Sequence, residues 1–490
     1  MNHTRLLWLA QRKSDRFIRK NFSSIQIIVA YYILMTVISY LLFCLPIFRE
    51  PDSHVPFIDL FFLAISTVSV TGLTTVDINS VFNDRGIVLL EVLFQVGGLG
   101  IMMISTVFFI LSKRRITLKQ RQLIMTDMNQ PRLSGIVRLI RTTFLILIWF
   151  QVIFGSLFSI YFYISGYYTN WRDAIFYGFY QAISAVTNSG FDISGDSIIP
   201  FAHDYLFLLA IMFLIFIGGI GFPVLLEIHE WLHFKKKNFR KKKRGLPFRF
   251  SLFSKIALLA FIVLFIGGTI LIYLLEKDHL FLTMNESGRW VSSMFYSMTT
   301  RNAGLQINDL GDFQITTLII FSVLMFIGCS PSSVGGGVRT TTVAIIGLYL
   351  LAFLKSEDDI SVFSRKIDDD DVKKSIVVFM LSLIMCFFAV VFLSATENLP
   401  LISIIVEVAS AFGTTGLSLG ITDDLTTVGK LMIALLMFIG RIGMLYTLMI
   451  FVPKETRDLG YEYPSEKIKN KASQVRGFVF YFFICVASLL

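Results

Sequence analysis

Long apolar runs alternate with short polar stretches along the whole chain, and the runs have the lengths of membrane-spanning helices. A helix needs about 20 residues to cross a hydrocarbon layer of about 30 Å. The runs come in pairs, and between the two runs of each pair lies a segment of about 12–16 residues. At about 1.5 Å per residue such a segment is too short to cross. The pattern therefore predicts spans in pairs, with a re-entrant hairpin inside each pair.

Two small-residue landmarks recur four times, so one structural unit is repeated along the chain. The first landmark ends each short segment, and its glycines are separated by 118, 114 and 112 residues. About 25 residues later a second landmark interrupts the second apolar run of each unit. The first landmarks are Gly72, Gly190, Gly304 and Gly416, and the second lie at 97–100, 218–221, 328–331 and 440–443.

The fold predicted from this pattern is an all-α polytopic membrane protein. It has four tandem span–pore-loop–span repeats, that is, eight transmembrane helices and four re-entrant pore hairpins around one pore. First spans are expected at 24–46, 138–165, 252–276 and 375–395, short helices at 57–69, 172–187, 289–300 and 400–413, and second spans at 86–111, 203–233, 312–354 and 429–452. Only the third second span, which is too long for one crossing, is expected to be broken.

The corresponding division of the chain is a cytoplasmic N-terminus (1–23), four repeats and their connections. The repeats are 24–111, 138–233, 252–354 and 375–452, the linkers are 112–137, 234–251 and 355–374, and a tail follows at 453–490. Units 1 to 4 below are these repeats in chain order.

Composition and charge agree with this topology. The chain of 490 residues is 55% hydrophobic and only 16% charged, which excludes an ordinary soluble protein. Its net charge of +10 might suggest nucleic acid binding, but 35 of the 44 Lys and Arg lie in or beside the termini and linkers. By the positive-inside rule both termini and all linkers are cytoplasmic, and the hairpins enter from outside.

The loops that end the short helices carry the predicted chemistry. Non-helical backbone at membrane depth is stable only where it is buried in protein or lines water. Around a shared axis, four such loops can replace the hydration shell of a cation with carbonyl oxygens, while the short helices aim their partially negative ends inward. Close helix packing would explain one glycine, but not four in register. The predicted ion-binding residues are Val70, Thr71, Gly72, Asn188, Ser189, Gly190, Asn302, Ala303, Gly304, Thr414, Thr415 and Gly416. Acidic residues just outside them should concentrate cations at the mouth: Asp77, Asp84, Asp192, Asp196, Asp309, Asp312, Asp423 and Asp424.

This fourfold arrangement resembles the Trk/Ktr/HKT superfamily of potassium transporters, up to about residue 470. Trk-type members have two additional N-terminal spans, so the chain is most similar to the Ktr-type membrane subunit. The resemblance implies potassium uptake across the cell membrane by a homodimer, with one pore per protomer, on a cytoplasmic RCK-type nucleotide-binding ring. Gly72 stands where sodium-preferring plant relatives have serine, which implies a preference for potassium. A sodium-preferring or sodium-coupled transporter of the same architecture is the alternative.

The third second span contains a run that cannot continue a helix, because it has a proline and three consecutive glycines. It lacks the GK[ST] of a phosphate-binding loop. The resemblance implies that 328–337 is an intramembrane gating loop beneath the filter, formed by Gly328, Ser330, Pro331, Ser332, Ser333, Gly335, Gly336 and Gly337. Arg441 interrupts the fourth second span, where a central arginine costs about 2.5–3.5 kcal/mol, so we expect it to face protein or water. The resemblance places it in the pore, in contact with the loop.

A rival hypothesis from another class is an intramembrane zinc protease, because His229, Glu230 and His233 fit H-E-x-x-H. We disfavour it: the sequence offers no evident third ligand, and the motif lies at the cytoplasmic end of its span, where such residues are common.

We expect no catalytic residue, metal or cofactor in this chain, and K⁺ only as the transported ion. The chain has no GxGxxG unit, so nucleotide control must come from the regulatory partner. Basic residues at 235–255 suit contact with anionic membrane lipid, and no nucleic acid partner is expected. The apolar segment 477–490 is too short to span reliably and is expected to lie at the interface or on the bundle.

Overall fold

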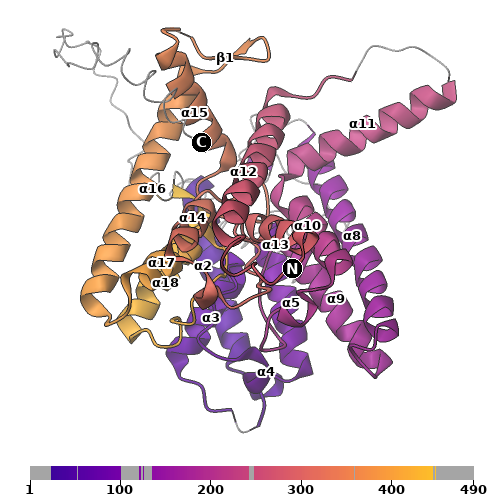
Figure 1. Ribbon diagram of the computed structural model, residues 1–490, viewed down its shortest axis with the longest axis vertical. Helices are drawn as coiled ribbons and strands as arrows, with labels where there is room; N and C mark the ends of the chain where they lie inside the picture. The colour runs from indigo at the N-terminus through magenta and orange to yellow at the C-terminus, as the bar shows by residue number, and fades with distance from the viewer. Residues whose placement is uncertain are drawn as a thin grey trace, which may run out of the picture.

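The computed structural model describes residues 24–51, 53–100, 121, 122, 125, 135–241, 248–357, 359–444 and 447, and these residues are mainly helical (Figure 1). Four long helices lie at the predicted first spans: α2 (Ser24–Phe43), α8 (Ile136–Ile164), α12 (Leu252–Glu276) and α16 (Asp369–Thr396). Each is long and apolar enough to cross a membrane, and only 17–33% of its most apolar window is buried inside the protein. Their outward-facing apolar side chains therefore suit contact with lipid.

Four short helices lie where the sequence predicts re-entrant segments, within three residues at each end. They are α3 (Phe57–Ser69), α9 (Trp171–Thr187), α13 (Glu286–Thr299) and α17 (Leu401–Gly413). In contrast to the long helices, their C-terminal halves are buried. Small outer elements surround them: η1 (Pro46–Phe48), α4 (Ile78–Val81), η2 (Ile199–Phe201) and η3 (Leu310–Asp312).

In every unit the second helix ends or breaks at the second landmark. In unit 3 the break lies where it was predicted, between α14 (Ile315–Phe326) and α15 (Thr340–Leu354). In unit 1, α5 (Asp84–Leu99) ends at Gly100 with φ +82°, and in unit 4, α18 (Thr427–Ile442) ends at Gly443 with φ +98°. Glycine permits these left-handed conformations at little cost.

The prediction of one continuous second span at 203–233 in unit 2 is wrong. The chain forms α10 (Tyr205–Gly219) and α11 (Phe222–Lys241), which meet at an angle of 106°. Gly221 has φ +99°, and the amide of Phe222 donates to Ser332 O of unit 3 at 2.7 Å. The helix therefore turns because a bond to a neighbouring unit replaces a bond along the helix.

The third linker is also more ordered than predicted. Residues 355–374 were predicted only as a linker, with no regular structure, and they contain the antiparallel hairpin of β1 (Ser361–Val362) and β2 (Arg365–Lys366). Helix α16 begins at Asp369, six residues before the predicted start. Asp368 caps it by accepting from Asp370 N at 3.2 Å, and three acidic residues in its first turn suit the helix dipole.

In each unit a polar contact joins the chain at or just after the end of the long first helix to the start of the second helix. In unit 3, Glu276 accepts from Gln314 N (3.1 Å) and Thr317 Oγ1 (2.5 Å). In unit 4, Glu397 accepts from Thr426 N (3.1 Å) and Thr426 Oγ1 (2.6 Å). Asn83 donates to Ile47 O in unit 1, and Tyr161 bonds Asp204 in unit 2. These contacts fix the start of each second helix against the chain that follows the first helix.

Several predicted segments lie outside the described residues. These are the N-terminus (1–23), the ends of the first and fourth second spans (101–111 and 448–452), nearly all of the first linker, residues 242–247 of the second, and the tail with its apolar segment 477–490.

Candidate functional site

Each short helix ends in a loop with an unusual backbone, and the pattern is the same in all four units. The residue two positions before each landmark glycine has positive φ: Val70 (58°), Asn188 (52°), Asn302 (76°) and Thr414 (54°). The glycines follow with φ of 91°, 64°, 68° and 96°, and the residue between has negative φ. Non-glycine residues with positive φ are uncommon, so four at equivalent positions indicate one shared loop structure.

Three of these loops close their helix in the same way. The amides of Thr71, Ser189 and Thr415 donate to Ser66 O (2.9 Å), Ser184 O (3.0 Å) and Ser410 O (2.8 Å). This six-to-one bond is the Schellman motif, which uses otherwise unpaired carbonyls at a helix end. Hydroxyl groups brace the same turns, as Ser69 Oγ does with Thr71 Oγ1 at 2.7 Å.

The four landmark glycines form a closed ring. A methyl group on Gly72 would collide with Ser189 O and approach Gly190; one on Gly190 would meet Ala303 O and Gly304. A methyl group on Gly304 would likewise meet Thr415 O and Gly416, and one on Gly416 would meet Thr71 O and Gly72 of the first unit. Each unit thus contacts the next in chain order, and unit 4 contacts unit 1. The predicted ion-binding residues therefore meet around one axis, with no room for any side chain at the glycines.

The second landmarks have small residues because they contact the backbone of the short helices. A methyl group on Gly97, Gly218 or Gly440 would collide with Val68 O, Val186 O or Phe412 O, each four residues before the ring glycine of its unit. Backbone therefore packs on backbone behind the loop. In unit 3, Gly328 instead faces Gly336 O and Asn302 Oδ1, because the segment between α14 and α15, predicted as a gating loop, folds back there.

Unit 3 departs from the other three around its ring residues. Helix α13 ends earlier, and the fully buried Arg301 stacks on Phe261 at 3.7 Å and donates to Phe261 O at 2.8 Å. The Asn302 side chain donates to Gly413 O and to Thr414 O (3.1 Å) and Oγ1 (2.9 Å) of unit 4. Asn302 thus joins two loops through its amide, a role that the prediction of carbonyl ligands did not include.

The segment between α14 and α15 lies against all the other units. Its amides at Ser330 and Val334 donate to Gly219 O (3.1 Å) and Gly218 O (3.2 Å) of unit 2. Its amide at Gly336 donates to Thr414 Oγ1 of unit 4 at 2.9 Å. Most of the segment is buried, and it lies directly behind the ring loops of units 3 and 4.

Arg441 is buried, with 7% of its surface exposed, at the end of α18. One guanidinium nitrogen donates to Val334 O in the gating-loop segment, and another donates to Gly97 O and to Gly98 O (2.9 Å) of unit 1. Carbonyl oxygens thus solvate a charge that would be costly at membrane depth. The predicted proximity of Arg441 and the loop is present in this arrangement.

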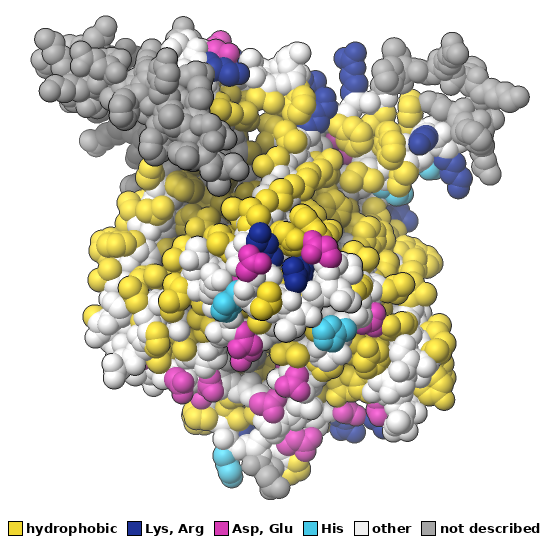
Figure 2. All heavy atoms as spheres, viewed as in Figure 1, with side chains coloured by type: hydrophobic (Ala, Val, Ile, Leu, Met, Phe, Trp, Pro, Cys, Tyr) yellow, Lys and Arg dark blue, Asp and Glu magenta, His cyan; other side chains and the backbone are white. Residues whose placement is uncertain are grey.

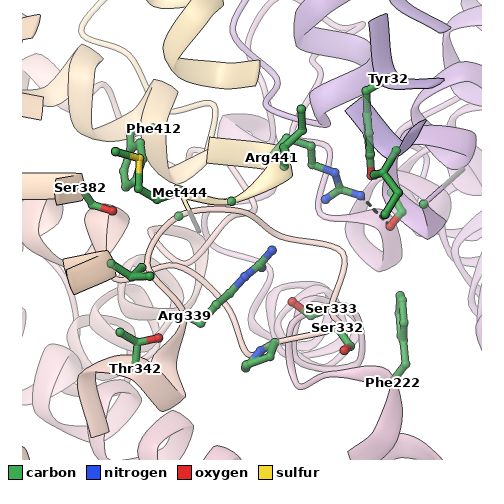
Figure 3. Close-up of a pocket in the computed structure, with 18 of the residues that line it drawn as sticks. Tyr32, Phe222, Ser332, Ser333, Arg339, Thr342, Ser382, Phe412, Arg441 and Met444 are labelled. Carbon is green, nitrogen blue, oxygen red and sulfur yellow. Dashed lines mark hydrogen bonds between the residues drawn. The ribbon is translucent and has the colours of Figure 1, made fainter. Parts of the chain in front are cut away.

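A cavity of about 160 Å³ lies on the side of the loop away from the ring. Figure 3 shows Arg339 and Arg441 extending toward the loop from different elements, with Ser332, Ser333 and Phe222 nearby. The Ser382 hydroxyl, on α16, also lines this cavity and has no hydrogen-bond partner among the described residues. Apolar side chains such as Phe412 and Met444 line the same cavity, so its wall is mixed polar and apolar.

Acidic side chains gather at the opposite end of the molecule. Figure 2 shows Asp and Glu over the lower part of this face, below a broad hydrophobic band, with several Lys and Arg at the upper end. All eight predicted mouth residues are exposed except the half-buried Asp192. Several also have local roles: Asp77 and Asp309 cap short helices, Asp192 binds the Ser194 and Ser197 amides, and Asp84 pairs with Arg172.

The residues of the H-E-x-x-H motif lie on α11. The rings of His229 and His233 stack with their centres 6.5 Å apart, and Glu230 pairs with Arg138 at 3.2 Å. In the described part of the chain, no group of three or more His, Cys, Asp or Glu side chains is arranged to hold a metal ion.

A buried ion pair joins the last unit to the first. Lys430 Nζ of α18 lies 2.8 Å from Asp59 Oδ1 of α3, with side-chain exposures of 12% and 8%. Units 4 and 1 are the neighbours that no linker joins directly. The sequence signal that could have found the pair is the presence of single charges inside otherwise apolar segments.

We expect Asp59→Asn or Lys430→Met alone to lower the free energy of unfolding by about 2 kcal/mol, between the values typical of exposed and fully buried pairs. The double substitution should recover most of the loss. Denaturation midpoints of the purified protein measure this. The exposed Arg172–Asp84 pair, at 2.7 Å, is the matched control: Arg172→Met should change stability by under about 1 kcal/mol. If substitutions in the two pairs changed stability equally, the Lys430–Asp59 pair would have no special role in joining units 4 and 1.

Comparison with known proteins adds independent findings. Residues 3–458 match the TrkH family, described as cation transport proteins. The chain is 42% identical over 446 residues to the Ktr system potassium uptake protein D of Bacillus subtilis, covering 91% of this chain and 97% of that protein. It is 34% identical over 457 residues to the potassium/sodium uptake protein NtpJ of Enterococcus hirae, covering 92% and 98%. The fold is similar to the crystal structure of the potassium transporter TrkH from Vibrio parahaemolyticus, with a TM-score of 0.68 at 17% identity over 88% and 86% of the two chains.

Proposed function

The chain belongs to the TrkH family of cation transport proteins, so it is a membrane transport protein and not an enzyme, and we propose that it is the ion-translocating subunit of a Ktr-type potassium uptake system. The observation that carries the proposal is the closed ring of Gly72, Gly190, Gly304 and Gly416. Two relatives whose names state potassium uptake align with nearly their whole length.

The ring loops act as the selectivity filter. Positive φ on both sides of a negative-φ residue brings successive carbonyls toward one side, and four such loops offer enough oxygens to replace the water around K⁺. The ligands are backbone carbonyls of Val70–Gly72, Asn188–Gly190, Asn302–Gly304 and Thr414–Gly416. Side-chain bonds behind the loops, such as Ser184 Oγ to Ser189 Oγ at 2.9 Å, hold the carbonyls in place.

Four repeats surround this pore, with eight spans and four hairpins that enter from outside. The repeats are those expected at 24–111, 138–233, 252–354 and 375–452. The acidic end seen in Figure 2 is the outer mouth, and the end that carries α11 and the β1–β2 hairpin is cytoplasmic (Figure 1). This orientation agrees with the positive-inside rule and gives cytoplasmic termini.

The gating-loop segment and Arg441 hold the resting pore closed. The loop lies behind the filter, and Arg441 fixes it at Val334 O while binding unit 1. A positive charge beneath the filter also raises the barrier for a cation. Shortening the loop within 332–337 should therefore raise flux without changing selectivity at the filter.

The active assembly is a homodimer on a cytoplasmic RCK-type ring, and nucleotide control comes from that ring. Support comes from the resemblance to Ktr-type subunits and from a relative named as a component of a Ktr system. Co-purification from a host that expresses both components, with the mass of the complex measured by light scattering, tests the assembly. A monomer that never retains the ring would refute it and leave the pore unaffected.

Sodium transport is the second candidate, because one relative is named as a potassium/sodium uptake protein. Proteoliposomes loaded with potassium and supplied with rubidium tracer distinguish the candidates. We expect uptake that external K⁺ inhibits at far lower concentration than Na⁺ does, together with growth rescue of a potassium-uptake-deficient host at low external potassium. Uptake that Na⁺ inhibits equally would favour the sodium candidate, and neither uptake nor rescue would refute both.

A further inference from the structure

Unit 3 holds a buried positive charge beside its filter loop, at a position where the other units have small side chains. Arg301 lies three residues before the ring glycine Gly304, and the corresponding residues of the other units are Ser69, Thr187 and Gly413. Only 1% of the surface of Arg301 is exposed. A buried charge therefore breaks the fourfold pattern directly beside the filter.

The side chain of Arg301 is enclosed between helices of units 2 and 3. Its guanidinium group stacks on the ring of Phe261 at 3.7 Å, and Phe216 of unit 2 packs against the same ring, with the two ring centres 5.1 Å apart. At Gly219, also in unit 2, an added Cβ would lie 2.9 Å from Cys329 Sγ and 3.5 Å from the Phe261 ring. Cys329 Sγ in turn donates to Arg301 O at 3.2 Å. The charge is thus held at a fixed place in the protein interior.

No carboxylate is paired with this charge in the described part of the chain. Nη1 of Arg301 donates to Phe261 O at 2.8 Å, but Nε and Nη2 have no hydrogen-bond partner among the described residues. None of the ion pairs that these residues form includes Arg301. Glu407, a fully buried acid of the neighbouring unit 4, instead accepts from Ser418 and Thr422. A carbonyl and an aromatic ring stabilise a cation but do not neutralise it, so its field extends to the filter.

A fixed positive charge at this place repels any cation in the filter. Arg301 directly precedes the filter residue Asn302, so chain geometry keeps its guanidinium group within about 15 Å of an ion at the carbonyls of unit 3. At an effective dielectric constant of about 20, this repulsion weakens the binding of a monovalent cation about five- to tenfold. The carbonyls and the negative ends of the short helices act in the opposite direction. Conduction needs both, because an ion that binds too tightly leaves slowly.

We infer that Arg301 sets the affinity of the filter for its ion: its charge weakens cation binding and thereby speeds release. This inference rests on the proposed function and adds a residue that acts on the ion without touching it. The charge repels K⁺ and Na⁺ alike, so it determines how tightly a cation binds and not which cation is preferred. Preference remains with the backbone carbonyls of the four loops.

The first test compares Arg301→Gln with Arg301→Lys in rubidium uptake by proteoliposomes of purified protein. Both side chains can donate to Phe261 O, but only lysine keeps the charge. In Arg301→Gln the half-saturating rubidium concentration should fall about five- to tenfold. The maximal rate should fall with it, because the ion leaves more slowly. Arg301→Lys should stay within about twofold of wild type in both values, since the charge is retained.

The concentrations at which K⁺ and Na⁺ inhibit uptake separate an effect of charge from a distorted filter. Both should fall by the same factor in Arg301→Gln, so that their ratio stays as in wild type, whereas displaced carbonyls would change the ratio. Arg289→Gln is the matched control on the same helix, α13. Arg289 also donates to backbone carbonyls, but its side chain is 23% exposed and lies 3.8 Å from Glu286. This substitution should leave both concentrations unchanged.

A second measurement needs no flux. Potassium that binds the folded state raises the melting temperature of the purified protein, and half of this rise should need about five- to tenfold less K⁺ in Arg301→Gln than in wild type. Arg301→Met, which lacks both the charge and the donor, should shift in the same direction.

Wild-type half-saturation in folded Arg301→Gln protein would overturn the inference. Equal shifts in Arg301→Gln and Arg301→Lys would also overturn it, because packing and not charge would then be responsible. The proposed function is judged separately. If the wild-type protein carries no rubidium, the transport proposal fails; if it does and Arg301→Gln has the same kinetics, only the role of Arg301 fails.

Discussion

Replacing Gly72 by serine is expected to reduce the preference for potassium over sodium about ten- to hundredfold. Gly72 has φ +91°, a conformation that serine rarely adopts, and its added Cβ would collide with Ser189 O of the neighbouring filter loop. Strained backbone of this kind costs about 1–3 kcal/mol, which relaxation of the two loops would release. Misplaced carbonyls fit a dehydrated potassium ion less well. Competition of K⁺ and Na⁺ against rubidium uptake measures the change.

Gly195 supplies a matched control for this substitution. Its φ is also +91°, but nothing lies within 4 Å of the position where a Cβ would be. Gly195→Ser should therefore strain the backbone of an outer loop without moving a filter carbonyl, and ion preference should stay as in wild type. Equal loss of preference in both variants would show that Gly72 acts through general stability and not through the filter.

The sequence allowed the position of the glycine ring to be predicted because the requirements of the ring are local. Each ring position needs positive φ and leaves no room for a side chain, and both requirements place a glycine at the same position of each unit. The second landmark is equally local, since Gly97, Gly218 and Gly440 each allow contact with a short-helix carbonyl. Which units are neighbours depends on contacts between distant segments, and only the structure shows it.

The features that sequence analysis missed depend on such distant contacts. The bend at Gly221 arises because Phe222 N bonds Ser332 O, 110 residues later in the chain. Asn302 was predicted to contribute only a carbonyl, yet its side chain bonds Thr414 in another unit. Neither partner is marked in the local sequence, because any exposed carbonyl or hydroxyl could serve.

Charged residues inside apolar segments are a weaker sequence signal, from which more buried polar contacts could have been predicted. Arg301 and Glu407 are both fully buried beside the filter loops. Glu407 accepts from Ser418 Oγ (2.7 Å) and Thr422 Oγ1 (2.6 Å), which fixes the chain that leaves the fourth loop. A charge at membrane depth needs partners, so each marks a position where the surrounding structure must supply them. The partners of these buried charges were identified only from the structure.

Replacing Arg441 by alanine is expected to raise ion flux in the absence of the regulatory partner by about a hundredfold. The side chain donates to one carbonyl of the gating-loop segment and two of unit 1, and hydrogen bonds to charged groups contribute about 1.5–3 kcal/mol each. Its loss removes the direct bond to Val334 and also the positive charge beneath the filter. Both changes favour the open pore, because the loop is released and the barrier for a cation is lower. Rubidium efflux from proteoliposomes of purified protein measures the effect.

Arg289 provides the control for a general loss of packing. It also donates to three backbone carbonyls, Phe281 O (3.1 Å), Leu282 O (2.9 Å) and Met284 O (3.1 Å), but near the outer end of α13, away from the gating-loop segment. Arg289→Ala should lower the melting temperature without opening the pore. If the two variants are equally destabilised and equally conductive, then Arg441 stabilises the fold and has no separate role in closing the pore. If flux falls in correctly folded Arg441→Ala protein, the arginine assists conduction and the closing element must lie elsewhere in the pore.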